Sequence, residues 1–281
     1  MIFQNAMSFK AKIKHAASTK GITTQQVMQN YLIEAFLAKL AKSNYRGNFV
    51  VKGGYLIGGI VGLEMRSTMD LDTTIVGFKL TPDNLTLIAK EILEIPTDES
   101  FVFTFDSVAE IRESSDYSGY RLKLRADFEQ IHETVTIDVT VGDAITPKEA
   151  YFNFDRIFNN DKIGLLSYPI ETVLAEKLET ILSRGIVTTR ARDYYDVYIL
   201  FMLKLDQIDL RTLKLALENT KNNRQSMFEL ADYEKILDDI KNSDFQRQLW
   251  HKYQKQYSYA KDTSFDNVIN TIEQLMFEIF K

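Results

Sequence analysis

Two aspartates, Asp70 and Asp72, stand two residues apart at the start of a β-branched segment, Leu71–Val76. In a strand, residues i and i+2 point to the same face, so these two carboxylates are expected to converge. Converging carboxylates repel each other unless a cation lies between them, and Mg²⁺ prefers oxygen ligands of this kind. The spacing therefore favours a magnesium site, although an isolated pair of this type is more often a solvated turn.

A third carboxylate, Asp138, lies in the later segment TVTIDVTVG, which alternates like a strand. If that strand neighbours the first one, Asp70, Asp72 and Asp138 are the expected metal ligands. Three carboxylates can hold two Mg²⁺ ions, of which one activates an attacking hydroxyl and the other neutralises a triphosphate. The pattern thus predicts transfer of a nucleotide from a nucleoside triphosphate.

A glycine pair, Gly53 and Gly54, ends a short β-branched run and opens an expected helix. Glycine lets the backbone approach a ligand closely, and the N–H groups at a helix N-terminus bind phosphate well. Ser67 and Thr68 could donate hydroxyl hydrogen bonds to the same phosphates. A glycine pair alone usually marks a tight turn, but the order strand, glycine pair, helix, Arg-Ser-Thr, aspartate pair and strand is a stronger signal.

A second polar cluster lies in the helical segment AEKLETILSRGIVTTRARDYYDVYIL. Arg192 and Asp196 are four residues apart, a spacing that places both on one helix face. Lys177 lies on the preceding expected helix. An intrahelical salt bridge beside a solvated lysine is the alternative interpretation, and it would be preferred if the first cluster were absent.

The elements that must position these residues follow from periodicity. Helical spacing of apolar residues predicts helices at 8–43, with Thr23 or Thr24 as a cap, and at 81–94. Alternation with period two predicts strands at 101–108, 119–128 and 134–142, in an antiparallel or mixed sheet with one covered face.

Beyond Pro169 the sequence becomes helical throughout. The expected helices lie at about 170–184, 190–204, 208–220, 229–256 and 265–280. The preceding stretch YFNFDRIFNNDKIG predicts no regular element, so a boundary is placed there. We therefore expect an α+β protein with a domain at 1–160, built on a mixed sheet flanked by helices, and a helical domain at 161–281.

Composition excludes several other classes of protein. The 281 residues are 45% hydrophobic, which is typical of globular proteins, and there is no cysteine for disulfides or thiolate zinc sites. No apolar run reaches the roughly 18 residues that span a bilayer, and no signal peptide is evident, so the cytoplasm is expected and no membrane partner. A basic arm at 1–52 precedes an acidic block at 53–150 within a net charge of −5.

Five motifs taken together resemble the AbiEii/AbiGii toxin family of nucleotidyltransferases, within the DNA polymerase β-like superfamily. They are Lys52–Gly54, Arg66–Asp72, Ile137–Val139, Ala175–Leu178 and Arg190–Tyr198. The resemblance implies a polymerase β-like first domain and transfer of a nucleotide from an NTP to RNA, commonly the acceptor end of tRNA. It also implies growth arrest or abortive phage infection, and an AbiEi-like antitoxin as partner of this type IV toxin–antitoxin system.

The resemblance also implies roles for individual residues. Lys177 becomes a phosphate-binding and catalytic lysine, and Asp196, or alternatively Asp193, becomes a catalytic or nucleotide-orienting acid. The full set expected to bind the nucleotide is Gly53, Gly54, Arg66, Ser67, Thr68, Lys177, Arg192 and Asp193. One departure is that the usual glycine–serine pair is glycine–glycine here, so backbone N–H groups, Ser67 or Thr68 must replace the serine hydroxyl.

Other functions are compatible with the same residues. The acceptor could instead be a protein or a small molecule, or the chain could be a non-catalytic binding module. A metal-dependent nuclease is disfavoured, because no (D/E)xK motif lies beside Asp70 or Asp138. The stretch 247–261 interleaves basic and aromatic residues, which suits either stacking of unpaired bases on Trp250 or a helix with buried aromatics.

Overall fold

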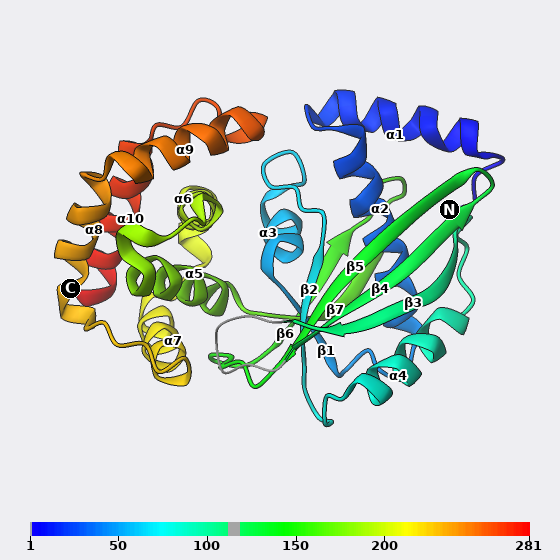
Figure 1. Ribbon diagram of the computed structural model, residues 1–281, viewed down its shortest axis with the longest axis horizontal. Helices are drawn as coiled ribbons and strands as arrows, with labels where there is room; N and C mark the ends of the chain where they lie inside the picture. Colours follow the sequence, from blue (N-terminus) through cyan, green and yellow to red (C-terminus); the bar gives the residue numbers. More distant parts are fainter. Residues whose placement is uncertain (1, 112–118) are drawn as a thin grey trace. The chain divides into compact units, whose positions relative to one another are not determined.

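The chain folds into two compact units, which are described separately. The computed structural model describes residues 2–111 and 119–281. One unit comprises Met1–Asp143 with Glu149–Ser167, and the other comprises Ala144–Lys148 with Tyr168–Lys281. The first contains a mixed sheet with helices and the second is helical, so the α+β class predicted from the sequence is confirmed (Figure 1).

The first unit is built on a seven-stranded sheet with the strand order β3-β4-β5-β2-β1-β7-β6. β2 pairs parallel with β5, and β1 pairs parallel with β7, whereas the other neighbours are antiparallel. The strands are β1 (Phe49–Lys52), β2 (Leu71–Ile75), β3 (Val102–Glu110), β4 (Gly119–Phe128), β5 (Ile131–Val141), β6 (Ala150–Asp155) and β7 (Lys162–Ser167). The strands expected around Asp72 and Asp138 are therefore present and adjacent.

The segment YFNFDRIFNNDKIG differs from its prediction, because it forms the β6–β7 hairpin. Phe154 and Ile163 are buried in this hairpin, and β7 reaches back to pair with β1. That pairing joins residues more than a hundred positions apart, so the local pattern gave no sign of it. The domain boundary expected at 160/161 falls in the turn between these strands.

Within the described part of this unit there are four helices: α1 (Ala6–Lys20), α2 (Thr24–Lys42), α3 (Gly53–Val61) and α4 (Pro82–Glu94). The single helix expected at 8–43 is two helices, because Gly21 adopts a left-handed φ of 65° and ends α1. Thr23 then caps α2, and its side chain accepts a hydrogen bond from the Gln26 backbone N–H. The cap position was predicted, whereas the break was not.

Helix α2 defines the covered face of the sheet. Gln25 and Gln29 of α2 donate side-chain hydrogen bonds to Glu133 of β5, so Glu133 points toward α2. Strand side chains alternate between faces, and Asp138 lies five residues further along the same strand. The carboxylate of Asp138 therefore points to the opposite face of the sheet, away from α2.

The second unit consists mainly of helices. They are α5 (Ile170–Arg184), α6 (Ala191–Lys204), α7 (Leu210–Asn223), α8 (Tyr233–Lys241), α9 (Asp244–Gln256) and α10 (Phe265–Phe280). The helix expected at 229–256 is divided at Ser243, whose side chain caps α9 by accepting from the Gln246 N–H.

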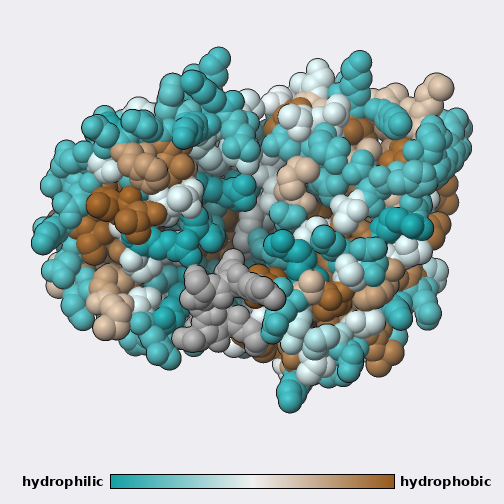
Figure 2. All heavy atoms as spheres, viewed as in Figure 1, coloured by the Kyte–Doolittle hydropathy of each residue, from teal (hydrophilic) through white to brown (hydrophobic). Residues whose placement is uncertain are grey.

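The helices give no indication of a membrane-crossing segment. Among the described residues, no helix is both long enough and apolar enough to span a bilayer. Hydrophilic residues predominate on the face of the molecule shown in Figure 2, and the hydrophobic ones form separate small patches.

Candidate active site

Two of the predicted metal ligands, Asp72 and Asp138, lie side by side on the sheet. Asp72 of β2 lies directly opposite Asp138 of β5 in the parallel pairing, and Asp70 immediately precedes β2. Asp72 and Asp138 are half-buried, whereas Asp70 is exposed. Residues in register on neighbouring strands share a face. The neighbouring strand expected to carry Asp138 is therefore present, while the role of Asp138 as a third metal ligand stays a prediction.

Two basic residues complete a row of charges across four strands. Lys52 of β1 lies opposite Asp72, and Arg121 of β4 lies opposite Asp138. Nε and Nη2 of Arg121 donate to the two oxygens of Asp138, at 2.8 and 2.7 Å. This hydrogen bonding to Asp138, followed by the nearby charges of Asp138, Asp70 and Asp72, raises the pKa of Arg121. The row therefore contains positively charged side chains as well as carboxylates.

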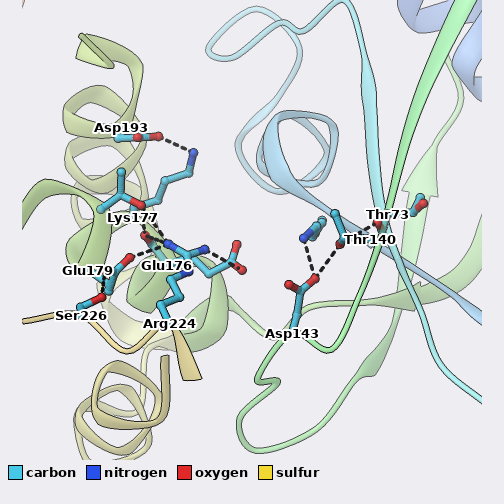
Figure 3. A network of polar contacts seen from close by, with 11 residues as sticks. Thr73, Thr140, Asp143, Glu176, Lys177, Glu179, Asp193, Arg224 and Ser226 are labelled. Carbon is cyan, nitrogen blue, oxygen red and sulfur yellow. Dashed lines mark hydrogen bonds and ion pairs between the residues drawn. The ribbon is translucent and has the colours of Figure 1, made fainter. Parts of the chain in front are cut away.

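The Lys52 end of this row has its own ion pair. The Lys52 ammonium lies 2.6 Å from Oδ2 of Asp143, and the same carboxylate accepts a hydrogen bond from the Thr140 hydroxyl at 2.8 Å (Figure 3). Neither Arg121 nor Asp143 was singled out from the sequence. For Arg121, the available signal was the alternation of basic and apolar residues in GYRLKLRADF.

The donor set of this cluster suits a hard divalent cation, because Asp70, Asp72 and Asp138 offer only carboxylate oxygens. Within the described ranges, however, no group of three His, Cys, Asp or Glu residues is arranged to hold a metal ion. Asp138 is engaged by Arg121, so a bound cation would have to share or replace that partner. The assignment of the three carboxylates as metal ligands stays a prediction.

Arg121 should compete with a cation for Asp138, which gives a first testable prediction. Replacing Arg121 with glutamine should tighten Mn²⁺ binding about two- to fivefold, since a half-exposed ion pair of this kind is worth up to about 1 kcal/mol. Titration of Mn²⁺ followed by electron paramagnetic resonance measures this effect. Arg125→Gln, on the same strand but away from the carboxylate row, is the matched control. Weaker binding in Arg121→Gln would show that Arg121 supports the cation site.

The two glycines that begin α3 are required by close approach. Gly53 has a φ of 64°, and a Cβ there would lie 2.1 Å from Oδ2 of Asp72. At Gly54, a Cβ would lie 2.8 Å from Nη2 of Arg66 and 3.1 Å from the Thr68 hydroxyl. The Arg66 guanidinium therefore lies close to where a side chain at position 54 would begin.

The close approach of Gly53 to Asp72 predicts that a side chain at position 53 would impair both the site and the stability of the protein. Gly53→Ala should displace the Asp72 carboxylate, weaken Mn²⁺ binding and lower activity about a hundredfold, because small misplacements at a reacting centre have effects of that size. The left-handed backbone should also destabilise the variant by about 1–2 kcal/mol. Mn²⁺ titration and urea unfolding measure the two effects. Gly47→Ala is the control, since a Cβ there meets nothing within 4 Å; equal behaviour of the two variants would refute the argument.

The residues between α3 and β2 that are predicted to donate hydrogen bonds to phosphate already have partners within the protein. Arg66, Ser67 and Thr68 are buried, with exposed fractions of 1%, 2% and 7%. Gln26 donates to the Ser67 hydroxyl at 2.7 Å, and Asn30 donates to the Thr68 carbonyl at 2.8 Å. These contacts fix the turn that leads into Asp70. A phosphate-binding role for the three residues stays a prediction.

In the helical unit, Lys177 of α5 contacts two carboxylates of α6. Its ammonium lies 2.6 Å from Asp193 Oδ1 (Figure 3). It also lies 3.1 Å from Asp196 Oδ2. Asp193 also accepts from Nε of Arg190 at 2.8 Å, and both aspartates are buried. Burial lowers the pKa of Lys177, but the charges of Asp193 and Asp196 outweigh burial and raise it.

The side chains of this second cluster make different contacts from those of the alternative interpretation. Lys177 is mostly buried rather than solvated, and Arg192 is exposed while Asp196 is completely buried. Arg192 donates instead to the Tyr257 hydroxyl at 3.1 Å. The alternative interpretation of an Arg192–Asp196 salt bridge beside a solvated lysine therefore does not describe the cluster. Lys177 with Asp193 and Asp196 forms its centre.

The aromatic residues of 247–261 are largely structural. Trp250 and Tyr253 are buried, with exposed fractions of 2% and 6%, and the Trp250 indole N–H donates to the Thr263 carbonyl. Lys252 and Lys255 lie at the surface. This is the helix with buried aromatics, rather than a row of rings exposed for base stacking.

Comparison with known proteins decides the family. The family model described as "Nucleotidyl transferase AbiEii toxin, Type IV TA system" matches residues 35–271. The chain belongs to this AbiEii family. The resemblance inferred from the sequence motifs is confirmed, and with it a nucleotidyltransferase toxin that acts on a nucleotide substrate and is paired with an antitoxin.

Two solved structures share the fold of this AbiEii chain. One is a candidate nucleotidyltransferase from H. pylori, with a TM-score of 0.50 and 17% identity over 92% of this chain and 98% of that one. The other, JHP933 from Helicobacter pylori, has the same TM-score, identity and coverage of this chain, and 94% of its own length is covered. At this identity they establish the architecture alone. No curated protein matches the chain significantly.

Proposed function

We propose that this AbiEii chain is a cytoplasmic, Mg²⁺-dependent enzyme that transfers a nucleotide from an NTP to RNA, with the acceptor end of tRNA as its target. Growth arrest or abortive phage infection would follow, and an AbiEi-like antitoxin would oppose it. The observation that supports this most is the register of Asp72 opposite Asp138, with Asp70 beside them and the Gly53 backbone against Asp72.

In this proposal, Asp70, Asp72 and Asp138 hold two Mg²⁺ ions, which when bound would acidify the attacking hydroxyl and neutralise the triphosphate. The backbone at Gly53 and Gly54 lets phosphate oxygens approach the start of α3. The acceptor hydroxyl oxygen bonds to the α-phosphorus while the bond from that phosphorus to pyrophosphate breaks, and the hydroxyl proton is released.

The helical unit supplies the remaining proposed roles. Lys177 is the phosphate-binding lysine, and its ammonium is held in place by Asp193 and Asp196. Asp196 is completely buried, while Asp193 also accepts a hydrogen bond from Arg190. This arrangement supports a role for both acids in fixing the lysine, and leaves exposed Arg192 as a candidate for nucleotide contact.

Purified protein with MgCl₂ and total RNA, incubated with each α-³²P-labelled NTP in turn, tests the proposal. Label in tRNA-sized RNA with wild type, and its loss in Asp72→Asn, would support it. Label in protein or in a small molecule would shift the acceptor to the corresponding alternative. Absence of label from every fraction would leave the non-catalytic binding module as the favoured function.

A further inference from the structure

A stripe of basic side chains runs along the outward face of β4. Residues buried on the other face alternate with Arg121, Lys123 and Arg125, so that every outward position from 121 to 125 is basic. The side chains of Arg121 and Arg125 are 46% and 63% exposed. β4 lies between β3 and β5, so this basic stripe is flanked by a strand on each side (Figure 1).

The positions beside the basic stripe carry hydroxyls. Ser107 of β3 and Thr136 of β5 lie opposite Lys123. Arg125 likewise has a threonine on either side, Thr104 and Thr134. These flanking positions add hydrogen-bonding groups and no carboxylate to the stripe.

Acidic groups are confined to the ends and edge of this surface. Asp127 accepts from Arg125 at 2.8 Å and contacts His132 at 2.7 Å. Asp106 contacts the Ser107 hydroxyl at 3.1 Å, and Asp138 pairs with Arg121. Among the described residues, Lys123 at the centre of the basic stripe forms no ion pair.

The basic stripe begins at the carboxylate row. Arg121 is in register with Asp138, which is in register with Asp72. Successive outward residues of a strand are about 6.8 Å apart, so Arg125 lies about 14 Å along the strand from Arg121. A polynucleotide whose end reaches the carboxylates must lead its phosphates away from them, and this stripe offers a regular series of positive charges within the same unit.

We propose that the basic stripe of Arg121, Lys123 and Arg125 binds the phosphate backbone of the acceptor RNA. This inference rests on the proposed function and names the surface that receives its substrate. Phosphate contacts of this kind position a nucleic acid without reading its sequence. A protein partner fits less well, because protein interfaces are centred on buried aromatic or apolar anchors and the stripe offers none.

The test is RNA binding without NTP, measured by fluorescence anisotropy with a fluorescein-labelled tRNA transcript over a range of KCl concentrations. Lys123→Gln/Arg125→Gln should weaken binding about tenfold at low salt and reduce the slope of log K against log[salt] by about 2. The matched control is Lys79→Gln/Lys90→Gln, which removes the same charge. Lys90 of α4 lies over the Phe105 ring of β3 and is not part of the stripe. Circular dichroism checks that both variants are folded.

Each outcome decides the inference. A selective loss in the stripe variant supports it. Wild-type affinity in that variant, an equal loss in the control, or no RNA binding by the wild type overturns it. Failure of the proposed function is separable: stripe-dependent RNA binding by a wild type that labels no RNA with any NTP would refute transfer to RNA and leave the binding surface intact.

Discussion

Asp72→Asn should abolish nucleotide transfer, with kcat reduced about a thousandfold or more, while the fold is retained. The asparagine keeps the size of the side chain but removes the charge that would hold a divalent ion opposite Asp138. Incorporation of α-³²P-labelled nucleotide into RNA measures the loss of activity, and Mn²⁺ titration measures the loss of the cation.

Stability should change little in Asp72→Asn. Removing one charge relieves the repulsion from Asp70 and Asp138, although it also weakens the attraction to Arg121. Asp155→Asn on β6 is the matched control, because its carboxylate is 80% exposed and pairs with Lys162 away from the carboxylate row. A fully active Asp72→Asn enzyme would show that the metal-site assignment is wrong.

Lys177→Met should destabilise the helical unit by about 3–5 kcal/mol. The substitution leaves Asp196, which is completely buried, without the cation 3.1 Å away, and removes the closer contact to Asp193. Breaking a buried ion pair by removing one partner has an effect of this size, because it leaves a desolvated charge uncompensated. Urea unfolding followed by circular dichroism measures the loss.

The pKa of Lys177 fixes the pH range of this stabilisation. Its folded-state pKa is raised by Asp193 and Asp196, so the contribution is fully present below the ordinary lysine value of about 10.5 and declines as the pH rises through the folded-state pKa. The difference between wild type and Lys177→Met should therefore shrink only at strongly alkaline pH.

A control and a second measurement separate structure from binding. Lys162→Met removes an exposed ion pair to Asp155 and should change stability by less than about 1 kcal/mol. If Lys177 also binds phosphate, Lys177→Met should lose NTP affinity about tenfold at a temperature where it remains folded. Unchanged NTP affinity there would leave Lys177 with a structural role only, and unchanged stability would contradict the buried-pair argument.

The sequence alone determined the features that depend on neighbours along the chain. The pair Asp70 and Asp72 at the start of a strand, the Thr23 cap and the helix opening at Gly53 follow from local spacing and backbone preference. The order of these motifs was enough to indicate the family, because their chemistry is shared by nucleotidyltransferases. The α+β class followed from the change of periodicity after Pro169.

Long-range packing, in contrast, sets which distant residues meet. The pairing of Arg121 with Asp138 depends on the register of β4 and β5, and the hairpin β6–β7 depends on pairing with β1. The burial of Arg66 against Gly54 and the contact of Lys177 with both Asp193 and Asp196 likewise arise from packing between separate segments. Strand register and side-chain burial are set by long-range contacts, and local periodicity carries no information about which partner each charge will find.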